Sequence, residues 1–444
     1  MAVGEQNGSH QNGESNGNGT ADSHIRYIPL SYSSADSDAS ARRLVLAIRP
    51  EWDDDTSSLE FVRFTDGITN TLLKAVNKRP GLSKEEVDNE AILLRAYGHG
   101  TDLIIDRHRE TQNHELLMRH GLAPELLARF ENGMMYRFIQ GAVTHPEDLR
   151  KPAIYKAVAR RLAQWHAAVP CISGRTGHSR KNSRTDAAYV LPTNSLGDAE
   201  FQHAIDNAAP GKPPPNVWTV MQKWIFALPT ETEAQRTRQA ELQKELTLLV
   251  AELSQRPGLG VNALVFAHCD LLSGNVIVLP PKSSSQQVTN SEKAATDVTF
   301  IDYEYATPSP AAFDIANHFA EWGGFDCDFS VLPTRAQRRE FIADYIRSYF
   351  SMLPENQKPA AAVDKAAEAE GLFTEVDHFR GVPGFYWGIW ALIQATISQI
   401  DFDYASYAET RLGEYWAWRA EVNGDRKASG KVAPLREARW AQEE

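Results

Sequence analysis

The chain has 444 residues, of which 42% are hydrophobic, and this is enough for one large domain or two medium domains with a substantial core. Its 46 basic and 58 acidic side chains give a net charge of −12, which argues against nucleic acid or an anionic membrane surface as the main partner. Three scattered cysteines, no apolar leader-like stretch and no apolar run of membrane-spanning length predict a cytoplasmic protein without stable membrane insertion.

The beginning of the chain is rich in Gly, Asn, Ser and Asp and has almost no aliphatic side chains. Such a stretch buries too little apolar surface to offset the entropy of ordering, so residues 1–40 are expected to be a disordered tail. Strands expected at 61–64 and 71–76 then open a nucleotide-binding lobe predicted over 41–140. The turn between these strands would bring backbone N–H groups to phosphate oxygens, although an ordinary hairpin turn is the alternative. Three residues of this turn are the candidates for that contact: Gly67, Thr69 and Asn70.

One cation lies in the next predicted strand. Residues 91–98 have the pattern of a strand that carries Arg95, at the place where kinase-like folds put the residue that pairs with the nucleotide phosphates. Helical spacing follows over 106–120, with Glu110 and Glu115 as candidate partners for the cation. We prefer Glu110, because Glu115 fits better on a solvated helix face.

A strand predicted over 133–141 ends at a glycine and suits a hinge between two lobes. Backbone groups at its end would meet an adenine edge, and they belong to Arg137, Phe138 and Ile139. The second lobe is predicted over 141–444 and is mainly helical, beginning with helices at 152–168, 218–226 and 231–255. Residues 171–215 are rich in Ser, Arg, Asn, Gly and Pro, which predicts a surface insertion.

Residues 268–275 read His-Cys-Asp-Leu-Leu-Ser-Gly-Asn. In protein kinases a loop of this spacing supplies an Asp that takes the proton of the attacking hydroxyl and an Asn that holds a metal; a later Asp holds the magnesium on the nucleotide phosphates. Asp270 is therefore the candidate base, and Asn275 and Asp302 are the candidate metal ligands. Short apolar strands would present them at one edge of a sheet, and they are predicted at 263–266, 276–279 and 298–301.

Two other interpretations of this loop stay open. A histidine such as His268 is often a hydrogen-bonded core residue rather than a catalytic group. A zinc site at His268, Cys269 and Asp270 has weak support, because Cys171 and Cys327 have no ligand-like spacing.

Further polar and aromatic patterns lie downstream. Residues 313–322 place several polar side chains on or near the apolar face of a helix, which indicates hydrogen-bonded anchors or a site. In the aromatic segment 385–393, Trp387 and Trp390 are three residues apart and face the same way on a helix. A core stripe is the alternative for this pair. Helices are also predicted at 335–350 and 408–421, before a polar tail from residue 423.

Together these motifs resemble the choline/ethanolamine kinase family, and within it the ethanolamine kinases of fungi. The likeness covers most of the chain from about 59 to 421 and is carried by residues 67–70, 136–141, 268–275, 300–305, 314–322 and 387–390. It implies an α+β, protein-kinase-like fold with a small β-rich lobe and a larger helical lobe. It also implies transfer of a phosphoryl group from ATP, with Mg²⁺, to ethanolamine, the first step of phosphatidylethanolamine synthesis by the CDP-ethanolamine route. By the same resemblance, Arg95 and Glu110 anchor phosphates. The residues that would surround the cationic amine are Glu321, Trp387 and Trp390.

The chain departs from the family pattern at Cys269, where Asn is common, and in the length of 171–215. Ethanolamine is preferred to choline because a primary ammonium gains from carboxylate acceptors, and the acid-rich segment 323–328 resembles the ethanolamine type. A choline kinase and an inactive kinase-like scaffold are the alternatives. The lack of Asp-Phe-Gly at Asp302 argues against a protein kinase. The expected partner is a small amino alcohol, and a homodimer is compatible with the sequence.

Overall fold

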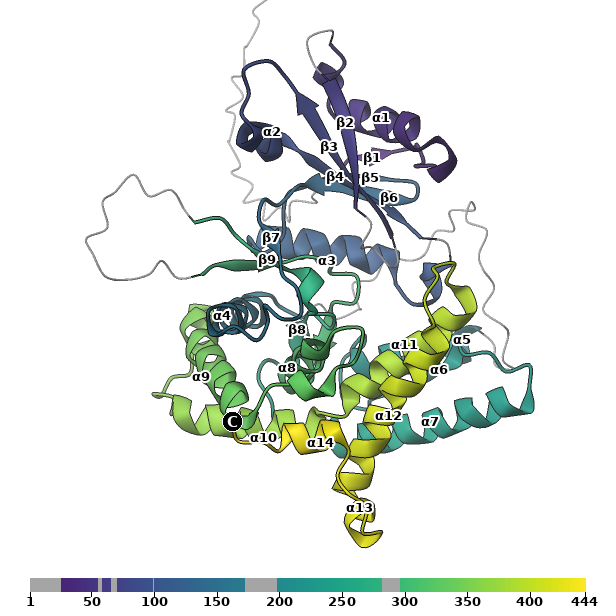
Figure 1. The fold of residues 1–444 in the computed structure, drawn as a ribbon, viewed down its shortest axis with the longest axis vertical. Coiled ribbons are helices and arrows are strands. Elements are labelled where there is room, and N and C mark those ends of the chain that lie inside the picture. The colour runs from purple at the N-terminus through teal and green to yellow at the C-terminus, as the bar shows by residue number, and fades with distance from the viewer. Residues whose placement is uncertain (1–24, 55–57, 65–69, 99, 172–197, 282–295) are drawn as a thin grey trace, which may run out of the picture.

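The computed structural model describes residues 25–54, 58–64, 70–98, 100–171, 198–281 and 296–444, and these form two lobes (Figure 1). The smaller lobe, drawn in purple and blue, is built on a six-stranded sheet, and the larger lobe is mainly helical. This arrangement confirms the α+β, two-lobed fold that the sequence predicts.

The sheet of the smaller lobe has the strand order β1-β5-β6-β4-β3-β2. All neighbours are antiparallel except β1 and β5. Its strands are β1 (Tyr27–Ile28), β2 (Ser58–Phe64), β3 (Asn70–Lys78), β4 (Ile92–Tyr97), β5 (Leu126–Phe130) and β6 (Gly133–Arg137). The helices of this lobe are α1 (Ser37–Ile48), α2 (Lys84–Glu90) and α3 (Arg107–Arg119).

The N-terminal segment differs from its prediction. Strand β1 and the first residues of α1 lie within the stretch expected to be disordered, so that expectation is wrong for residues 25–40; residues 1–24 lie outside the described part of the chain. Only a few apolar side chains anchor the beginning of this segment. Ile28 and Tyr32 are buried on the sheet, and the Tyr32 backbone exchanges hydrogen bonds with the Asn132 amide at 2.9 and 3.0 Å.

The larger lobe contains two small sheets, with strand orders β10-β9-β7 and β11-β8. The strands are β7 (Ala142–Val143), β8 (Val265–Ala267), β9 (Val276–Val278), β10 (Val298–Phe300) and β11 (Thr307–Ser309). The helices are α4 (Pro152–Ala168), α5 (Asp198–Asp206), α6 (Val217–Phe226), α7 (Glu233–Leu253), α8 (Ala311–Ala320), α9 (Arg335–Met352), α10 (Lys365–Phe379), α11 (Val382–Ile397), α12 (Tyr404–Val422), α13 (Asp425–Ala428) and α14 (Leu435–Trp440). None of the described helices is both long and apolar enough to cross a membrane.

The strand pair predicted to present the metal ligands is present. Strands β9 and β10 pair in antiparallel register, with Val276 opposite Phe300, so the residues just before β9 and just after β10 lie at the same end of the hairpin. Strand β8, fully buried, leads into the loop that the sequence marks as catalytic. A rigid strand on each side therefore fixes where this loop begins and ends.

Two stretches of the larger lobe have more structure than the sequence analysis assigned. Helix α5 lies inside the insertion predicted over 171–215, of which 172–197 are outside the described residues. Helices α13 and α14 lie in the polar tail, and Arg436 and Trp440 of α14 are buried. The sequence did not predict helices in this tail, because its charged residues pair with residues that are distant in the chain.

Helices α11 and α12 approach each other closely because of two glycines. A Cβ atom at Gly384 would lie 2.5 Å from the Arg411 carbonyl oxygen, and one at Gly388 would lie 2.6 Å from Leu412 Cγ. Only glycine fits at such a contact. This approach places Phe385 and Trp390 of α11 against Tyr415 and Tyr404 of α12.

Buried neutral histidines make the stability of this fold sensitive to acid. Burial lowers the pKa of His114 on α3 to about 4, and its Nε2 lies 2.9 Å from the Pro124 carbonyl oxygen. The unfolded chain takes up the proton near pH 6.5, so the contribution of His114 is fully present above that pH and is lost as the pH falls toward 4.

We therefore expect the free-energy difference of unfolding between the wild type and His114→Gln to change with pH. Glutamine keeps a donor but does not titrate, so any advantage of the wild type shrinks by about 2 kcal/mol between pH 7 and pH 5. Urea unfolding of both proteins at each pH measures this, with the exposed His120→Gln as control. A difference that stays constant with pH would contradict the assignment.

Candidate active site

The loop between β8 and β9 is held by three side chains of α8. Asp314 accepts the backbone N–H groups of His268, at 3.0 Å, and of Cys269, at 2.8 Å. Asn317 Nδ2 donates to the Cys269 carbonyl at 3.0 Å, and His318 Nδ1 donates to another loop carbonyl at 2.8 Å. These three residues are three and four positions apart and share one helix face. The polar residues that the sequence marks in this helix are therefore anchors of the loop.

Cys269, the position that departs from the usual family pattern, lies behind the loop. Its φ of +63° is in the left-handed region, which Asn tolerates better than most residues. Its buried Sγ lies 3.3 Å from Ser309 Oγ on β11. Among the described residues, no group of three or more His, Cys, Asp or Glu side chains is arranged to hold a metal, so the zinc interpretation gains no support.

Asp270 and Asn275 contact each other across the loop. Asn275 Nδ2 donates to the Asp270 backbone carbonyl at 2.7 Å and to its Oδ2 at 3.1 Å, which leaves the amide oxygen of Asn275 facing elsewhere. Burial raises the pKa of the Asp270 carboxyl well above its ordinary value. The nearby charges of Asp302, Glu321 and Glu304 raise this pKa further. The site thus concentrates negative charge that a bound cation would offset.

Asp302 follows β10 and faces the smaller lobe. It has a φ of +65°, and its Oδ1 lies 2.8 Å from Nη1 of Arg95. Burial raises the pKa of Asp302 to about 6, against the opposing effect of the Arg95 charge. Its side chain is 26% exposed, whereas those of Glu110 and Glu304 are 5% and 3% exposed. Asp302 is therefore the most accessible carboxylate around Arg95.

Arg95 on β4 is buried and connects the two lobes. Its three guanidinium nitrogens each face a different carboxylate: Nε lies 3.2 Å from Glu110 Oε1, Nη1 lies near Asp302, and Nη2 pairs with Glu304. These charges raise the pKa of Arg95 against the opposing effect of burial. The structure thus brings Arg95 and Glu110 together, whereas Glu115 pairs with Arg119 at 2.5 Å along the helix.

Two residues of this cluster were missed by the sequence analysis. Glu304 receives the Asn70 amide at 3.0 Å and also contacts Arg107 Nη1 at 3.2 Å, so it joins three elements. Arg107 Nη1 lies 2.9 Å from Glu110 Oε2. Glu304 had a signal, because it stands two residues after Asp302 in the string Asp-Tyr-Glu-Tyr. Arg107 had none, because it is one of several charged residues at the start of α3.

The other predicted nucleotide contacts are placed less completely. Gly67 and Thr69 lie outside the described residues. The backbone N–H groups of Arg137 and Phe138 already donate to the carbonyls of Glu125 and Ala91, at 2.9 and 3.0 Å. These two N–H groups are therefore not available to an adenine. Ile139 follows them; within the described residues its N–H makes no backbone hydrogen bond.

The predicted substrate residues lie on two helical elements beside this loop. Glu321 begins the short helix η5 (Glu321–Gly323) at the end of α8 and is buried. Trp387 and Trp390 of α11 are buried, with ring centroids 5.5 Å apart and planes at 86°. The sequence analysis did not single out Tyr305, whose ring centroid lies 5.5 Å from that of Trp387. Burial raises the pKa of Glu321, against the effect of the Arg411 charge.

Both indole N–H groups of the tryptophan pair have acceptors. Trp387 Nε1 donates to Asn317 Oδ1 at 2.8 Å, and Trp390 Nε1 donates to the Tyr305 hydroxyl at 2.8 Å. The rings are therefore fixed in orientation, so only their faces and edges remain for a ligand. Asn317 is bonded both to the loop of Asp270 and to Trp387, so it connects this loop with the tryptophan pair.

The residues present fit a magnesium ion. Asp302 supplies a carboxylate and Asn275 an amide oxygen, and Mg²⁺ prefers such oxygen ligands. It is usually held by only one or two protein groups together with water and substrate phosphates. The excess negative charge around Asp270 points the same way.

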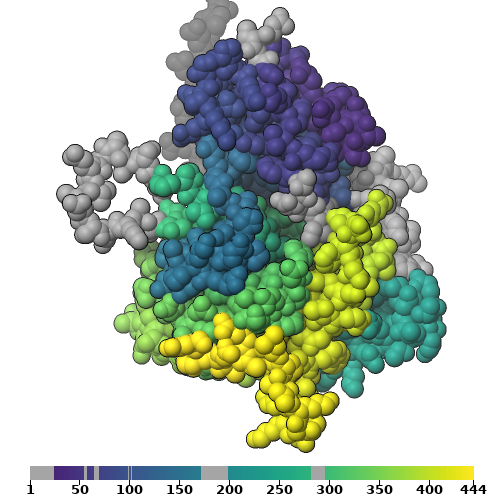
Figure 2. Space-filling model, viewed as in Figure 1, coloured from purple at the N-terminus to yellow at the C-terminus, as the bar shows by residue number. Residues whose placement is uncertain are grey.

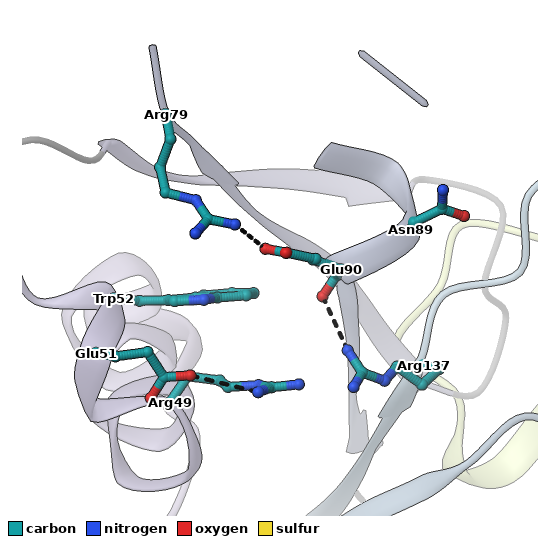
Figure 3. A pocket seen from close by; sticks show the side chains of 7 residues that line it. All are labelled: Arg49, Glu51, Trp52, Arg79, Asn89, Glu90 and Arg137. Carbon is teal, nitrogen blue, oxygen red and sulfur yellow. Dashed lines mark hydrogen bonds and ion pairs between the residues drawn. The ribbon is translucent and has the colours of Figure 1, made fainter. Parts of the chain in front are cut away.

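The structure also has a cavity away from this site. It has a volume of about 580 Å³ and is on the smaller lobe, lined by Arg49, Glu51, Trp52, Arg79, Asn89, Glu90 and Arg137 (Figure 3). The Arg137 side chain points into this cavity, where its Nη1 lies 3.4 Å from the Glu90 carbonyl oxygen. Each of its arginines has a carboxylate partner, and none of its lining residues belongs to the loop of Asp270.

Comparison with known proteins agrees with this geometry. The family model described as "Choline/ethanolamine kinase" matches residues 61–416. "Ethanolamine kinase 1" of Mus musculus is 32% identical over 392 residues, covering 86% of this chain and 89% of that protein. "Probable ethanolamine kinase" of Nematostella vectensis is 32% identical, covering 86% and 93%. A solved ethanolamine kinase of Plasmodium vivax superposes with a TM-score of 0.60 at 22% identity, covering 86% and 89%, and shares the fold. The chain belongs to the choline/ethanolamine kinase family.

Proposed function

We propose that this protein phosphorylates ethanolamine, with ATP as the phosphoryl donor. The observation that carries the proposal is the placement of a buried carboxylate, Asp270, on a loop that also carries Asn275 and that is tied to Trp387 through Asn317. Relatives across 86% of the chain carry the name ethanolamine kinase, which supports the same activity. The intact set of base and metal ligands argues against an inactive scaffold.

In the proposed reaction, Asp270 accepts the proton of the ethanolamine hydroxyl as its oxygen attacks the γ-phosphorus and ADP leaves. Asp302 and Asn275 would hold Mg²⁺, which supplies positive charge to the phosphate oxygens. Arg95, fixed by three carboxylates, would contact the phosphates from the smaller lobe. Asp270 must be ionised to act, and a cationic substrate lowers the raised pKa of this buried group.

The substrate ammonium would lie between Glu321 and the tryptophan pair. A primary ammonium donates hydrogen bonds to a carboxylate, whereas a quaternary ammonium interacts only through charge and aromatic faces. Among the described residues, Glu321 Oε1 is bonded to Arg411 and Oε2 has no hydrogen-bond partner. In the acid-rich segment 323–328, by contrast, the Asp328 side chain accepts the backbone N–H of Ser330 and so caps the short helix η6 (Phe329–Val331). Asp326 is exposed. The preference for ethanolamine therefore depends on Glu321.

Competition between isotope-labelled ethanolamine and choline, with magnesium and ATP, tests this function. We expect kcat/KM to be about tenfold higher for ethanolamine, the effect of one charge-assisted hydrogen bond, with choline turned over as a side activity. Removal of magnesium by a chelator should abolish both reactions. A preference for choline would overturn the choice of substrate.

A cytoplasmic location and a homodimer remain predictions. Cell fractionation tests the first, and light scattering of the purified protein tests the second.

A further inference from the structure

A chain of buried ion pairs connects the candidate substrate carboxylate to the C-terminal helix. It begins at Glu321, whose Oε1 lies 3.0 Å from Arg411 Nη1 on α12. Arg411 Nε lies 2.8 Å from Glu414 Oε1, and Glu414 Oε2 lies 3.2 Å from Arg436 Nε on α14. All four side chains are at most 6% exposed. Burial of this extent keeps solvent from screening the charges, so each member affects the next.

The series of ion pairs continues beyond Arg436 and ends at Arg380. Arg436 Nη1 lies 2.7 Å from Glu437 Oε1, and Glu437 Oε2 lies 2.9 Å from Arg380 Nη2. Three arginines and three glutamates thus alternate, and their formal charges cancel. Arg436 also donates to the Arg380 carbonyl. Within the described structure, Arg436 is the residue of α14 that faces Glu414.

Helix α14 has separate anchors that do not involve these charges. Arg338 of α9 donates to the Trp440 carbonyl at 3.0 Å, and its guanidinium lies 3.9 Å above the Trp440 ring. Arg439 donates to the Leu332 carbonyl at 2.9 Å. Figure 2 shows the C-terminal segment, in yellow, lying across the surface of the larger lobe. The helix would therefore stay attached without Arg436.

We propose that Arg436 is a positioning residue for the substrate: through Glu414 and Arg411 it fixes the orientation of Glu321 and so the affinity for the ammonium group. This inference rests on the proposed function, which assigns Glu321 to that group. Residue 436 lies outside the region 61–416 matched by the family model, so the family pattern does not account for it.

The physical basis is competition for Arg411. With Arg436 present, Glu414 has two cationic partners, and the Arg411 guanidinium forms ion pairs with both Glu414 and Glu321. Without Arg436, the buried Glu414 carboxylate keeps one partner, and an unpaired buried charge is costly. Arg411 is then drawn toward Glu414. Glu321 loses the contact that holds its second oxygen toward the substrate.

The test compares steady-state kinetics of Arg436→Met with the wild type. We expect the KM for ethanolamine to rise about tenfold, the equivalent of one charge-assisted hydrogen bond, while kcat and the KM for ATP change less than about twofold. Adding Glu414→Gln to this variant should restore the KM, because the neutral amide no longer draws Arg411 away. If Arg436→Met fails to fold, Arg436→Lys serves in its place and should give a smaller rise in the same KM.

Arg338→Met is the matched control, because Arg338 is equally buried and holds the same helix through Trp440. It should lower the melting temperature without raising the KM for ethanolamine. The inference is wrong if a folded Arg436 variant keeps the wild-type KM, if the double variant is not restored, or if Arg338→Met raises the KM equally. Absence of ethanolamine turnover in the wild type would instead contradict the proposed function.

Discussion

Substitution of Asp270 by alanine is expected to lower kcat by about 10²- to 10⁴-fold, the range for loss of a positioned general base. Asp270 is buried, and its Oδ2 accepts a hydrogen bond from Asn275 Nδ2 at 3.1 Å. Among the described residues 268–275 of the loop held by α8, Asp270 is the one with a carboxylate. Turnover of labelled ethanolamine under saturating substrates measures the change.

Folding and nucleotide binding should survive this substitution. The pKa of Asp270 is raised by burial and by three neighbouring carboxylates, so its ionised form is unfavourable in the folded, ligand-free site. The isosteric Asp270→Asn variant should therefore unfold at the same temperature as the wild type or a higher one. Fluorescence titration with ATP checks that the nucleotide still binds. Near-normal turnover in either variant would falsify the assignment of the base.

Replacement of Arg95 by methionine is expected to destabilise the protein by about 3–5 kcal/mol and to remove ATP binding. The side chain is 4% exposed and faces the carboxylates of Glu110, Asp302 and Glu304, which would be left buried without this cation. The loss should exceed that of an ordinary core substitution. Chemical unfolding and calorimetric titration with magnesium-ATP measure the two effects.

Arg95→Lys separates charge from shape. Lysine brings the same charge, but a single ammonium cannot face three carboxylates as the planar guanidinium fork does. We expect an intermediate stability and a nucleotide affinity between those of the wild type and Arg95→Met. The control is Arg119→Met, which breaks the Arg119–Glu115 pair on α3 and should change little, because the Arg119 side chain is 54% exposed. If Arg95→Met were as stable as this control, the buried cluster would not hold the lobes together as described.

Several predictions depended only on residues that are close in the sequence, and these agree with the structure. The loop of Asp270 lies between two short buried strands, and the helix predicted over 152–168 begins at Pro152, which favours the first turn of a helix. The polar residues of α8 have the spacing that places them on one face. Each of these features depends on neighbours a few residues away, so a single sequence contains the information.

Predictions that depended on partners distant in the chain were incomplete. The preference for Glu110 as partner of Arg95 agrees with the observed ion pair, but the pair with Glu304, 209 positions away in the chain, was missed. The order of residues 25–40 was missed for the same reason, because β1 pairs with β5, about a hundred residues later. Composition alone does not report such pairing.

The sequence by itself determined that an Asp, an Asn and a second Asp stand at the ends of short strands, because strand periodicity and motif spacing are local. Only the tertiary structure decided which charges meet. Glu321 is bound to Arg411, and α14 adds Arg436 to that pair across 115 positions of the chain, the separation from residue 321 to residue 436. The physical reason is that the strength of a buried ion pair depends on distance in space and on exclusion of water, and both are set when the helices pack.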